Sequence, residues 1–450
     1  MLSRSEDRRQ LSAAAADRPA SGLTSGGIDA IKGVAILAVV VGHNSLLSDQ
    51  DPGLWHVIYT FNIFPFFFLP FLFPARPLTR QYAADRTVRY LVPWALVYLV
   101  CASLYFLQSR NLTWIEWLAD VGLGLAVGTG ALVKQASGFT LFWFLPCLFA
   151  LVMFKAAGTC WPRVGGALVM GAGVVLLAVA GLLPPAALAC VPATAHLALM
   201  MCPVGAALAW IWRRAQGRVP RWVIAAVCGG VWLGLSGWIY VSPVSADYGT
   251  LTILDPISFA VRVGAMMSSF LFLCAAADWL GRWSLLVALG RHSLMVYLTS
   301  SLWFQVWLRL ERMLWLPAWY SASLAFRVGA SVLFSVAGAY LVSRVVSDVE
   351  PLRRWVLPRF WSEWPPAVAV SHGFHRHGAG GERARCTGRI SFPPALCRWD
   401  GNWQLATRQT HQLPTGLVPV EVVIARLPGF CHSFHRHEQM RCERFPEFWS

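Results

Sequence analysis

Two ionisable residues in one apolar segment give the first sign of chemistry in this sequence. Lys32 and His43 lie eleven residues apart in the segment 28–44, IDAIKGVAILAVVVGHN. At 3.6 residues per turn, this spacing puts both on one helix face, within about 20° of each other and roughly 16 Å apart along the axis. Ionisable side chains are costly inside a bilayer, and their presence there marks a candidate functional site. The pair therefore predicts chemistry inside a membrane.

Each residue of this pair also has a structural explanation, which stays open at this stage. A lysine near the end of an apolar helix is often an anchor whose ammonium reaches the interface. A neutral histidine in such a helix needs a hydrogen-bond partner, and Asn44 or Ser45 could supply one. A further histidine, His56, stands at the start of the next apolar segment.

Two arginines form a second candidate group. Arg86 and Arg89 lie three residues apart in the segment 85–93, DRTVRYLVP, just before an apolar run. At helical spacing their guanidinium groups would project side by side, and such forks grip phosphate bidentately. The alternative is that they are only the basic residues that commonly flank a transmembrane helix on its cytoplasmic side.

The elements that must position these residues are membrane helices. Hydrophobic residues make up 56% of the chain and charged residues 13%, against about 25% charged in soluble domains. We therefore expect an all-α fold, a polytopic membrane helix bundle of about ten transmembrane helices. The expected spans are apolar runs of about 17–25 residues, and they cover 28–47, 54–75, 90–107, 139–156, 165–183, 196–212, 221–241, 256–280, 284–307 and 324–346.

The arginines of the loops orient these spans. With ten spans, most of the loop arginines fall on the side that holds the polar tail 1–27. The opposite side has few basic residues, and acidic residues balance them. Counting the glycine-rich segment 118–133 as a crossing would invert every later loop, so we expect that it is not one. The positive-inside rule then predicts both termini in the cytoplasm. Because loops and tail explain the net charge of +15, nucleic-acid binding is not needed to account for it.

The residues after the last span have a different composition. We expect a membrane domain over 28–346 and a disordered cytoplasmic tail over 347–450. After about Phe360 the long apolar runs stop, and Arg, His, Pro, Gly and Trp are mixed without helical or strand periodicity. Two similar histidine-rich stretches, 372–377 and 432–437, lie near cysteines, a combination that could bind zinc. No CxxC pair or standard ligand spacing occurs there, so we expect no metal site.

The chain resembles the acyltransferase-3 superfamily of integral membrane proteins, particularly its fucose 4-O-acetylase-like branch. The likeness covers about residues 25–346 and depends on five stretches in order. They are the K-x10-H helix, the phenylalanine-rich TFNIFPFFFLPFLFPARPL, the RTVR loop, LFWFLPCLF and LGRHSLMVYL.

The resemblance implies transfer of an acyl group, usually acetyl, from cytoplasmic acetyl-CoA to a hydroxyl of a glycan or glycolipid at a bacterial inner membrane. It makes His43 the catalytic histidine and Lys32 its motif partner. Arg86 and Arg89 become the acyl-CoA contacts, and Trp143 a wall of the transfer site. Acyl-CoA is then a donor substrate, with no permanently bound cofactor.

Two further residues are expected to contact substrate, and the acceptor and oligomeric state stay open. Asn44 adjoins the histidine, and Arg262, inside the eighth span, could pair with Asp255 or line an acceptor groove. The ordinary pKa of histidine suits a general base that takes a proton from the acceptor hydroxyl.

The sequence departs from the family pattern in three places. Pro70 and Phe71 replace a usual Ser-Gly pair, Asn62 stands where many relatives have histidine, and Thr299-Ser300 stand where a histidine often follows. These departures leave a catalytically impaired homologue as one alternative. A transporter or flippase with a substrate path lined by Lys32, His43 and Arg262 is the other, although no internal repeat supports it.

Overall fold

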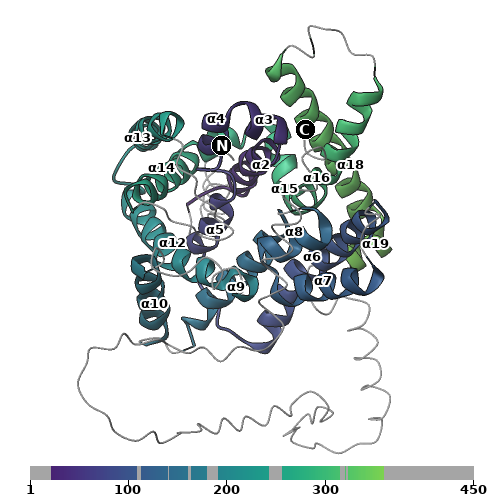
Figure 1. The fold of residues 1–450 in the computed structure, drawn as a ribbon. Helices are drawn as coiled ribbons and strands as arrows, with labels where there is room; N and C mark the ends of the chain where they lie inside the picture. The colour runs from purple at the N-terminus through teal and green to yellow at the C-terminus, as the bar shows by residue number, and fades with distance from the viewer. Residues whose placement is uncertain are drawn as a thin grey trace, which may run out of the picture. The chain divides into compact units, whose positions relative to one another are not determined.

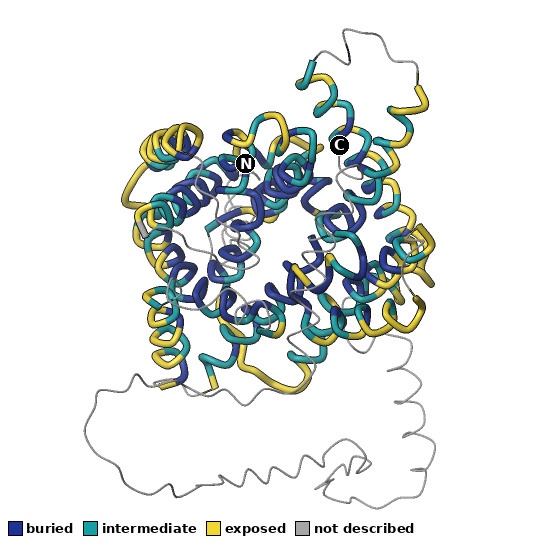
Figure 2. Tube along the Cα trace, in the orientation of Figure 1, coloured by how far each residue is buried: buried dark blue, intermediate teal, exposed yellow. Residues whose placement is uncertain are grey.

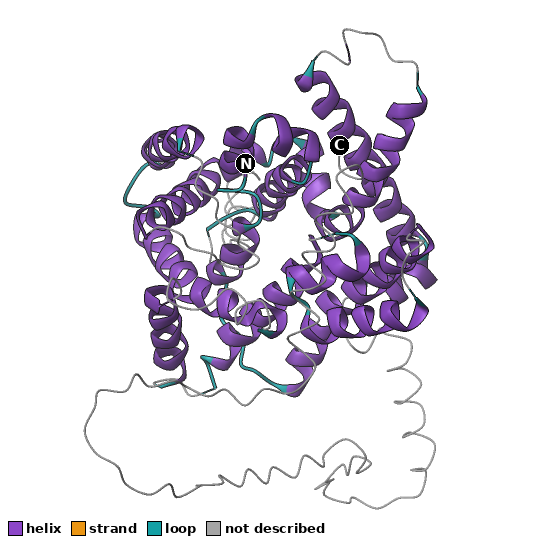
Figure 3. Ribbon diagram, viewed as in Figure 1, coloured by secondary structure: helices purple, strands orange, loops and turns teal. Residues whose placement is uncertain are grey.

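The computed structural model describes residues 22–108, 113–139, 141–160, 164–179, 191–242, 256–314, 320 and 323–358. In these residues the regular elements are helices (Figure 3), which confirms the expected all-α fold. The first half of this part contains α2 (Ser25–Gly42), α3 (Ser45–Gln50), α4 (Pro52–Ile58), α5 (Phe64–Leu72), α6 (Arg80–Gln108), α7 (Trp114–Val127), α8 (Gly130–Ser137), η1 (Leu141–Trp143) and α9 (Phe144–Ala157). The second half contains α10 (Gly165–Val179), η3 (Pro192–Thr194), α12 (Ala195–Ala215), α13 (Arg221–Val241), α14 (Pro256–Leu280), α15 (Ser284–Arg291), α16 (Ser293–Met313), α18 (Leu324–Asp348) and α19 (Glu350–Val356).

Six of the described helices are long and apolar enough to cross a membrane. They are α2, α6, α12 with η3, α13, α14 and α18. A seventh span is possible if α15 and α16, which are bent by 87° at His292, count as one, and η1–α9 and α10 are shorter apolar helices. The polytopic helical bundle is therefore confirmed, while the expected number of about ten spans is not.

The expected spans 28–47 and 54–75 are each interrupted. α2 ends at Gly42, and Asn44 caps α3 by accepting a hydrogen bond from the Leu46 N–H at 3.0 Å. Asp51 caps α4 in the same way through the Leu54 N–H at 2.9 Å. A side chain that satisfies the free N–H groups of a new helix start favours that start over continuation. Where two continuous spans were expected, the structure has α2, the short helices α3 and α4, and then α5.

The segment 118–133 is also interrupted, as its exclusion from the spans requires. α7 begins at a capping box formed by Thr113 and Glu116 and ends at Gly128, whose φ of 67° is left-handed. Glycine adopts this conformation without the penalty of a Cβ. α8 then starts at Gly130, and neither helix is a candidate span.

Helix α2 packs against α3 and α4, which follow it directly, and against α5, α14, α15, α16 and α18 (Figure 1). It meets α15 at backbone distance, because a Cβ at Gly33 would overlap the Leu286 carbonyl oxygen and one at Gly290 would overlap that of Asp29. Buried residues gather in α2 and α5, whereas α10 and α13 carry long exposed faces (Figure 2). Exposed leucines, valines and tryptophans on α13 suit contact with lipid.

Candidate functional site

His43 occupies the residue that ends α2, with φ −95° and ψ 11°. Its ring Nδ1 lies 2.8 Å from the Val39 carbonyl oxygen. Because a carbonyl only accepts hydrogen bonds, Nδ1 carries the ring proton and Nε2 carries the lone pair. The Tyr59 hydroxyl lies 3.4 Å from Nε2, longer than a strong hydrogen bond. The ring therefore presents a basic nitrogen that a closer hydroxyl could engage.

The predicted partners of His43, Asn44 and Ser45, do not bond its ring. The ring instead meets the carbonyl one turn back and the Tyr59 hydroxyl. The Asn44 amide is 1% exposed, and it donates to the Ser331 hydroxyl at 2.6 Å while its oxygen caps α3. Asn44 thus ties α3 to α18, and its expected substrate contact stays a prediction.

The segment after α3 holds the histidine in place. The Trp55 indole N–H donates to the Gly42 carbonyl at 2.7 Å, and the Trp55 ring packs on Tyr59 with centroids 4.4 Å apart. A Cβ at Gly42 would lie 3.0 Å from the Tyr59 ring and 3.4 Å from the Asn62 amide nitrogen. The end of α2 is therefore enclosed by α4 and the turn that follows it.

Asn62 brings an unused hydrogen-bond donor to this place. Its side chain is fully buried, its oxygen accepts from the Ile63 N–H at 2.6 Å, and its amide nitrogen has no partner. A buried donor without an acceptor is destabilising and rare in native structures. Asn62 was noted in the sequence only as a departure from the family pattern, so its geometry here is new.

Lys32 lies on α2 toward the opposite end from His43, and its ammonium is ion-paired. Nζ is 3.0 Å from Asp29 Oδ1, and Arg291 Nε is 3.4 Å from the other oxygen of the same carboxylate. The structure therefore does not bring Lys32 and His43 into contact. Sequence reasoning missed Asp29 as the partner, although its spacing of three residues from Lys32 is that of a helical ion pair.

Arg86 and Arg89 share α6 but not the same environment. Arg86 is half-buried, with its guanidinium carbon 4.8 Å from the centre of the Tyr82 ring, and its Nε is buried without a hydrogen-bond partner. Arg89 is exposed. Arg86 interacts electrostatically with Lys155 of α9, as does Arg213 of α12. Lys155 and Arg213 are not among the site residues that the sequence predicted.

Arg262 and His56 form a buried pair. Arg262 of α14 is 2% exposed, and its Nη2 lies 3.3 Å from His56 Nδ1 on α4. An arginine only donates, so this histidine nitrogen accepts. Asp255, the expected partner, lies outside the described residues. Arg262 thereby joins α14 to the segment that holds His43, and its expected substrate contact stays a prediction.

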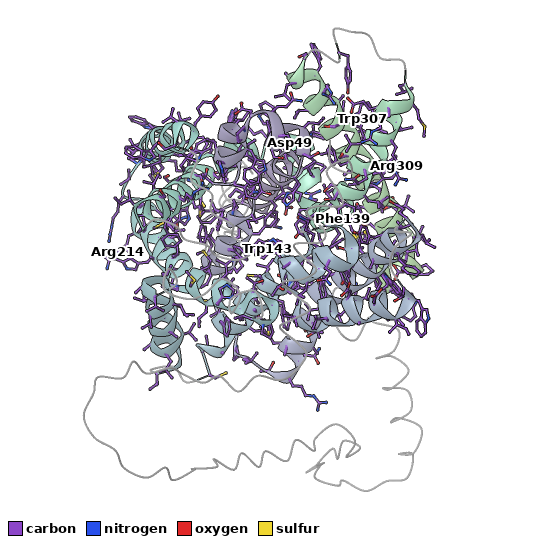
Figure 4. The ribbon with its side chains drawn as sticks, in the orientation of Figure 1. Asp49, Phe139, Trp143, Arg214, Trp307 and Arg309 are labelled. Atoms are coloured by element: carbon purple, nitrogen blue, oxygen red, sulfur yellow. The ribbon has the colours of Figure 1, made fainter. Side chains whose placement is uncertain are left out.

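A tyrosine of α16 holds the short helix that ends with Trp143. The Tyr297 hydroxyl donates to the Leu141 carbonyl at the start of that helix. Trp143 is 9% exposed and lies among the helices (Figure 4), near α8, where a Cβ on Gly130 would meet it at 3.4 Å. Its role as a wall of the transfer site stays a prediction.

The described part of the chain contains no group of three or more His, Cys, Asp or Glu side chains that could hold a metal ion. The histidine stretches weighed for zinc, 372–377 and 432–437, lie outside that part.

Comparison with known proteins gives one match. The model of a family described as an acyltransferase domain, acyltransferase-3, matches residues 25–344. No curated protein and no solved structure matches the chain. The matched range runs from the start of α2 into α18 and includes every site residue described above.

Proposed function

The chain belongs to the acyltransferase-3 family, and from this premise we propose that it is an O-acetyltransferase of a bacterial inner membrane. The proposed donor is acetyl-CoA, and the proposed acceptor is a hydroxyl of a cell-surface glycan or lipid-linked sugar. The five sequence stretches named above favour the fucose 4-O-acetylase-like branch.

The observation that carries the proposal is the orientation of the His43 ring. Its Nδ1 is bound to the Val39 carbonyl, and Nε2, with only the Tyr59 hydroxyl 3.4 Å away, is the nitrogen that can act as a base. In the proposed step, Nε2 takes the acceptor hydroxyl's proton as that oxygen attacks the thioester carbonyl. The tetrahedral intermediate then expels the CoA thiolate, which takes the proton from the imidazolium and leaves as the thiol. The acetyl ester and free CoA are the products, and His43 returns to its starting form.

Two donors are available for the charge that develops on the carbonyl oxygen, Asn62 and Lys32. The Asn62 amide lies beside Gly42 and has no partner, whereas Lys32 is ion-paired toward the other end of α2. We therefore attribute carbonyl stabilisation to Asn62. Lys32, Arg86 and Arg89 are then left for the phosphates of the donor, with Trp143 and Arg262 nearer the acceptor.

The test is the acetyl content of surface glycan in cells with the intact gene, a deletion, or His43→Ala at matched membrane expression. We expect both changed strains to lose O-acetyl ester, since removing a general base lowers rates by about 10²–10⁴. His292→Gln is the histidine control, because His292 bonds Ser343 at 2.9 Å at the junction of α15 and α16.

The other outcomes separate the parts of the proposal. Loss of acetyl in the deletion but not in His43→Ala would leave an acetyltransferase with a different base. Retention in both would exclude surface-glycan acetylation by this chain, and the transporter alternative would then be tested by following glycan export.

A further inference from the structure

Two cations, Lys155 and Arg213, bond backbone carbonyls at the C-terminal end of α5, the end away from His43. The Lys155 ammonium donates to the carbonyl oxygens of Pro70 and Phe73, the latter at 2.8 Å. Arg213 donates from Nη1 to the Phe71 carbonyl at 3.5 Å. Figure 1 shows α5, α9 and α12 side by side, and each of these three helices packs on the other two.

Arg86 adds a third positive charge to this place. It comes from α6, which packs on α9, and both Arg86 and Arg213 interact electrostatically with Lys155. The buried Nε of Arg86 has no hydrogen-bond partner. We name Arg86, Lys155 and Arg213 the α5 cation cluster.

No member of the α5 cation cluster forms an ion pair within the described residues, whereas Lys32, Arg221, Arg291 and Arg327 there each contact a carboxylate. Like charges held close together destabilise one another. Carbonyl dipoles at a helix end stabilise cations, and both Lys155 and Arg213 bond such carbonyls. These dipoles carry no net negative charge, so three positive charges remain close together. A multivalent anion would neutralise them.

We propose that the α5 cation cluster binds the diphosphate of the acyl-CoA donor. The proposal rests on the proposed acetyl transfer and adds Lys155 and Arg213, which the family resemblance does not supply. Arginine forks suit phosphate oxygens bidentately and lysine provides a point charge. Arg86 contributes through its buried Nε, while the exposed Arg89 lies outside the cluster.

The length of α5 agrees with this arrangement. Its nine residues span about 13 Å, from the cluster at Pro70–Phe73 to the turn where Asn62 adjoins the end of α2. Acyl-CoA carries its thioester at the end of an extended pantetheine arm. An arm that lies along α5 with its diphosphate on the cluster would bring the thioester toward His43.

Arg213→Gln tests the proposal, with Arg213→Lys as the variant that keeps the charge and Arg214→Gln as the neighbouring control. Arg214 lies 5.4 Å from the centre of the Trp210 ring and projects outward from α12 (Figure 4). Lys155 is left intact because its carbonyl bonds support α5. The first measurement is the affinity of purified full-length protein for CoA, without turnover, at two salt concentrations.

We expect Arg213→Gln to weaken CoA binding about tenfold or more, since hydrogen bonds to charged groups contribute about 1.5–3 kcal/mol. Arg213→Lys restores part of the affinity, and Arg214→Gln leaves it unchanged. Inorganic triphosphate competes with CoA for the wild type more strongly than for Arg213→Gln. In turnover, Arg213→Gln raises KM for acetyl-CoA and leaves kcat the same. Its KM for acetyl-pantetheine, a substrate that lacks the diphosphate, also stays the same.

Three results would overturn the inference. The first is a CoA affinity of Arg213→Gln equal to that of the wild type. The second is a loss of CoA affinity in Arg214→Gln as large as in Arg213→Gln. The third is a loss of activity with acetyl-pantetheine together with a loss of thermal stability in Arg213→Gln, which would indicate a structural role. The proposed function fails separately. A wild type that binds CoA through Arg213 but transfers no acetyl group overturns the transfer alone, and one that transfers acetyl with an affinity independent of Arg213 overturns the cluster alone.

Discussion

At the scale of single residues, the reactivity of His43 comes from its neighbours. The Val39 carbonyl accepts a hydrogen bond from the Nδ1–H, so the ring is oriented with Nε2 facing Tyr59. A histidine held by its own helix in this way needs no acidic partner to fix its tautomer. The residues that surround Nε2 then determine how well an acceptor hydroxyl can reach it.

Tyr59→Phe tests the contact between the tyrosine hydroxyl and Nε2. The Phe ring keeps the tilted ring contact with Trp55 and loses only the hydroxyl 3.4 Å from His43. We expect kcat to fall about threefold to tenfold with KM for acetyl-CoA unchanged, because one neutral hydrogen bond contributes about 1 kcal/mol. Steady-state kinetics of the purified variant check this. An unchanged kcat would mean that Tyr59 only packs against the histidine.

Asn62→Leu removes the unpartnered amide while keeping the side chain's size. The substitution also removes the oxygen that accepts from the Ile63 N–H, so a fall in melting temperature is expected in either case. If the amide donates to the developing oxyanion, kcat falls about 10²–10³-fold as well, as for loss of one such donor. A drop in melting temperature with unchanged kcat would instead limit Asn62 to its hydrogen bond with the Ile63 N–H. Parallel kinetics and thermal unfolding in detergent separate the two.

The spacing of Lys32 and His43 predicted that both lie on one helix, well separated along its axis. The structure places Lys32 in α2 and His43 at the residue that ends it. The spacing did not predict their partners. Asp29 was visible at helical spacing from Lys32. The fold of distant segments brings Tyr59 and Asn62 to the end of α2, and Lys155 to the end of α5. Spacing along the chain predicts neighbours on one helix, and contacts between helices lie beyond it.

At the scale of elements, hydropathy located the long helices well. The expected spans 221–241 and 256–280 coincide with α13 and α14. The breaks at His43 and after Ile58 were missed, because the apolar residues continue across them. The Asp51-Pro52 helix start was readable as a cap followed by a first-turn proline. Hydropathy averages over such signals, so a broken segment is read as one span.

The contact between α2 and α15 depends on glycine. Gly290→Ala places a methyl group against the Asp29 backbone carbonyl, so one helix must move. We expect a loss of about 1–3 kcal/mol, typical of overpacking, together with weakening of the Arg291–Asp29 ion pair. The measurement is the melting temperature of the purified variant. Gly171→Ala on α10 is the matched control, because nothing lies within 4 Å of its added Cβ. Equal melting temperatures for the two variants would show that α15 does not need this close approach.

At the scale of the whole membrane domain, two groups of polar contacts lie at opposite ends of the helices. At one end, Arg221 bonds Asp278 and the Gly22 carbonyl, and Arg291 meets Asp29. These bonds join the start of α2, the start of α13 and the ends of α14 and α15. The sequence-based topology also puts three of these ends on one side from loop charges alone: the start of α2, the start of α13 and the end of α14. The end of α15 falls inside the predicted span 284–307.

The other end is marked by different contacts. Arg309 bonds Gln108 at 2.8 Å, which joins the ends of α6 and α16, and Arg327 bonds Glu311 at 2.9 Å. The predicted topology assigns the connections after α6 and α16 to the far side. Helix packing and the positive-inside rule thus agree on which ends lie together, although the number of spans differs between them.

This agreement predicts the outcome of a topology map. Green fluorescent protein fused after residue 220 or residue 348 is expected to fluoresce, because both positions lie on the side that the positive-inside rule assigns to the cytoplasm. A fusion after residue 314 is expected to be dark, and alkaline phosphatase there is expected to be active. The three fusions test the path through α13, α14, α15–α16 and α18. Fluorescence at 314 together with darkness at 220 would invert the bundle. It would put the α5 cation cluster on the side without acyl-CoA, so the donor site proposed above would then have to be abandoned.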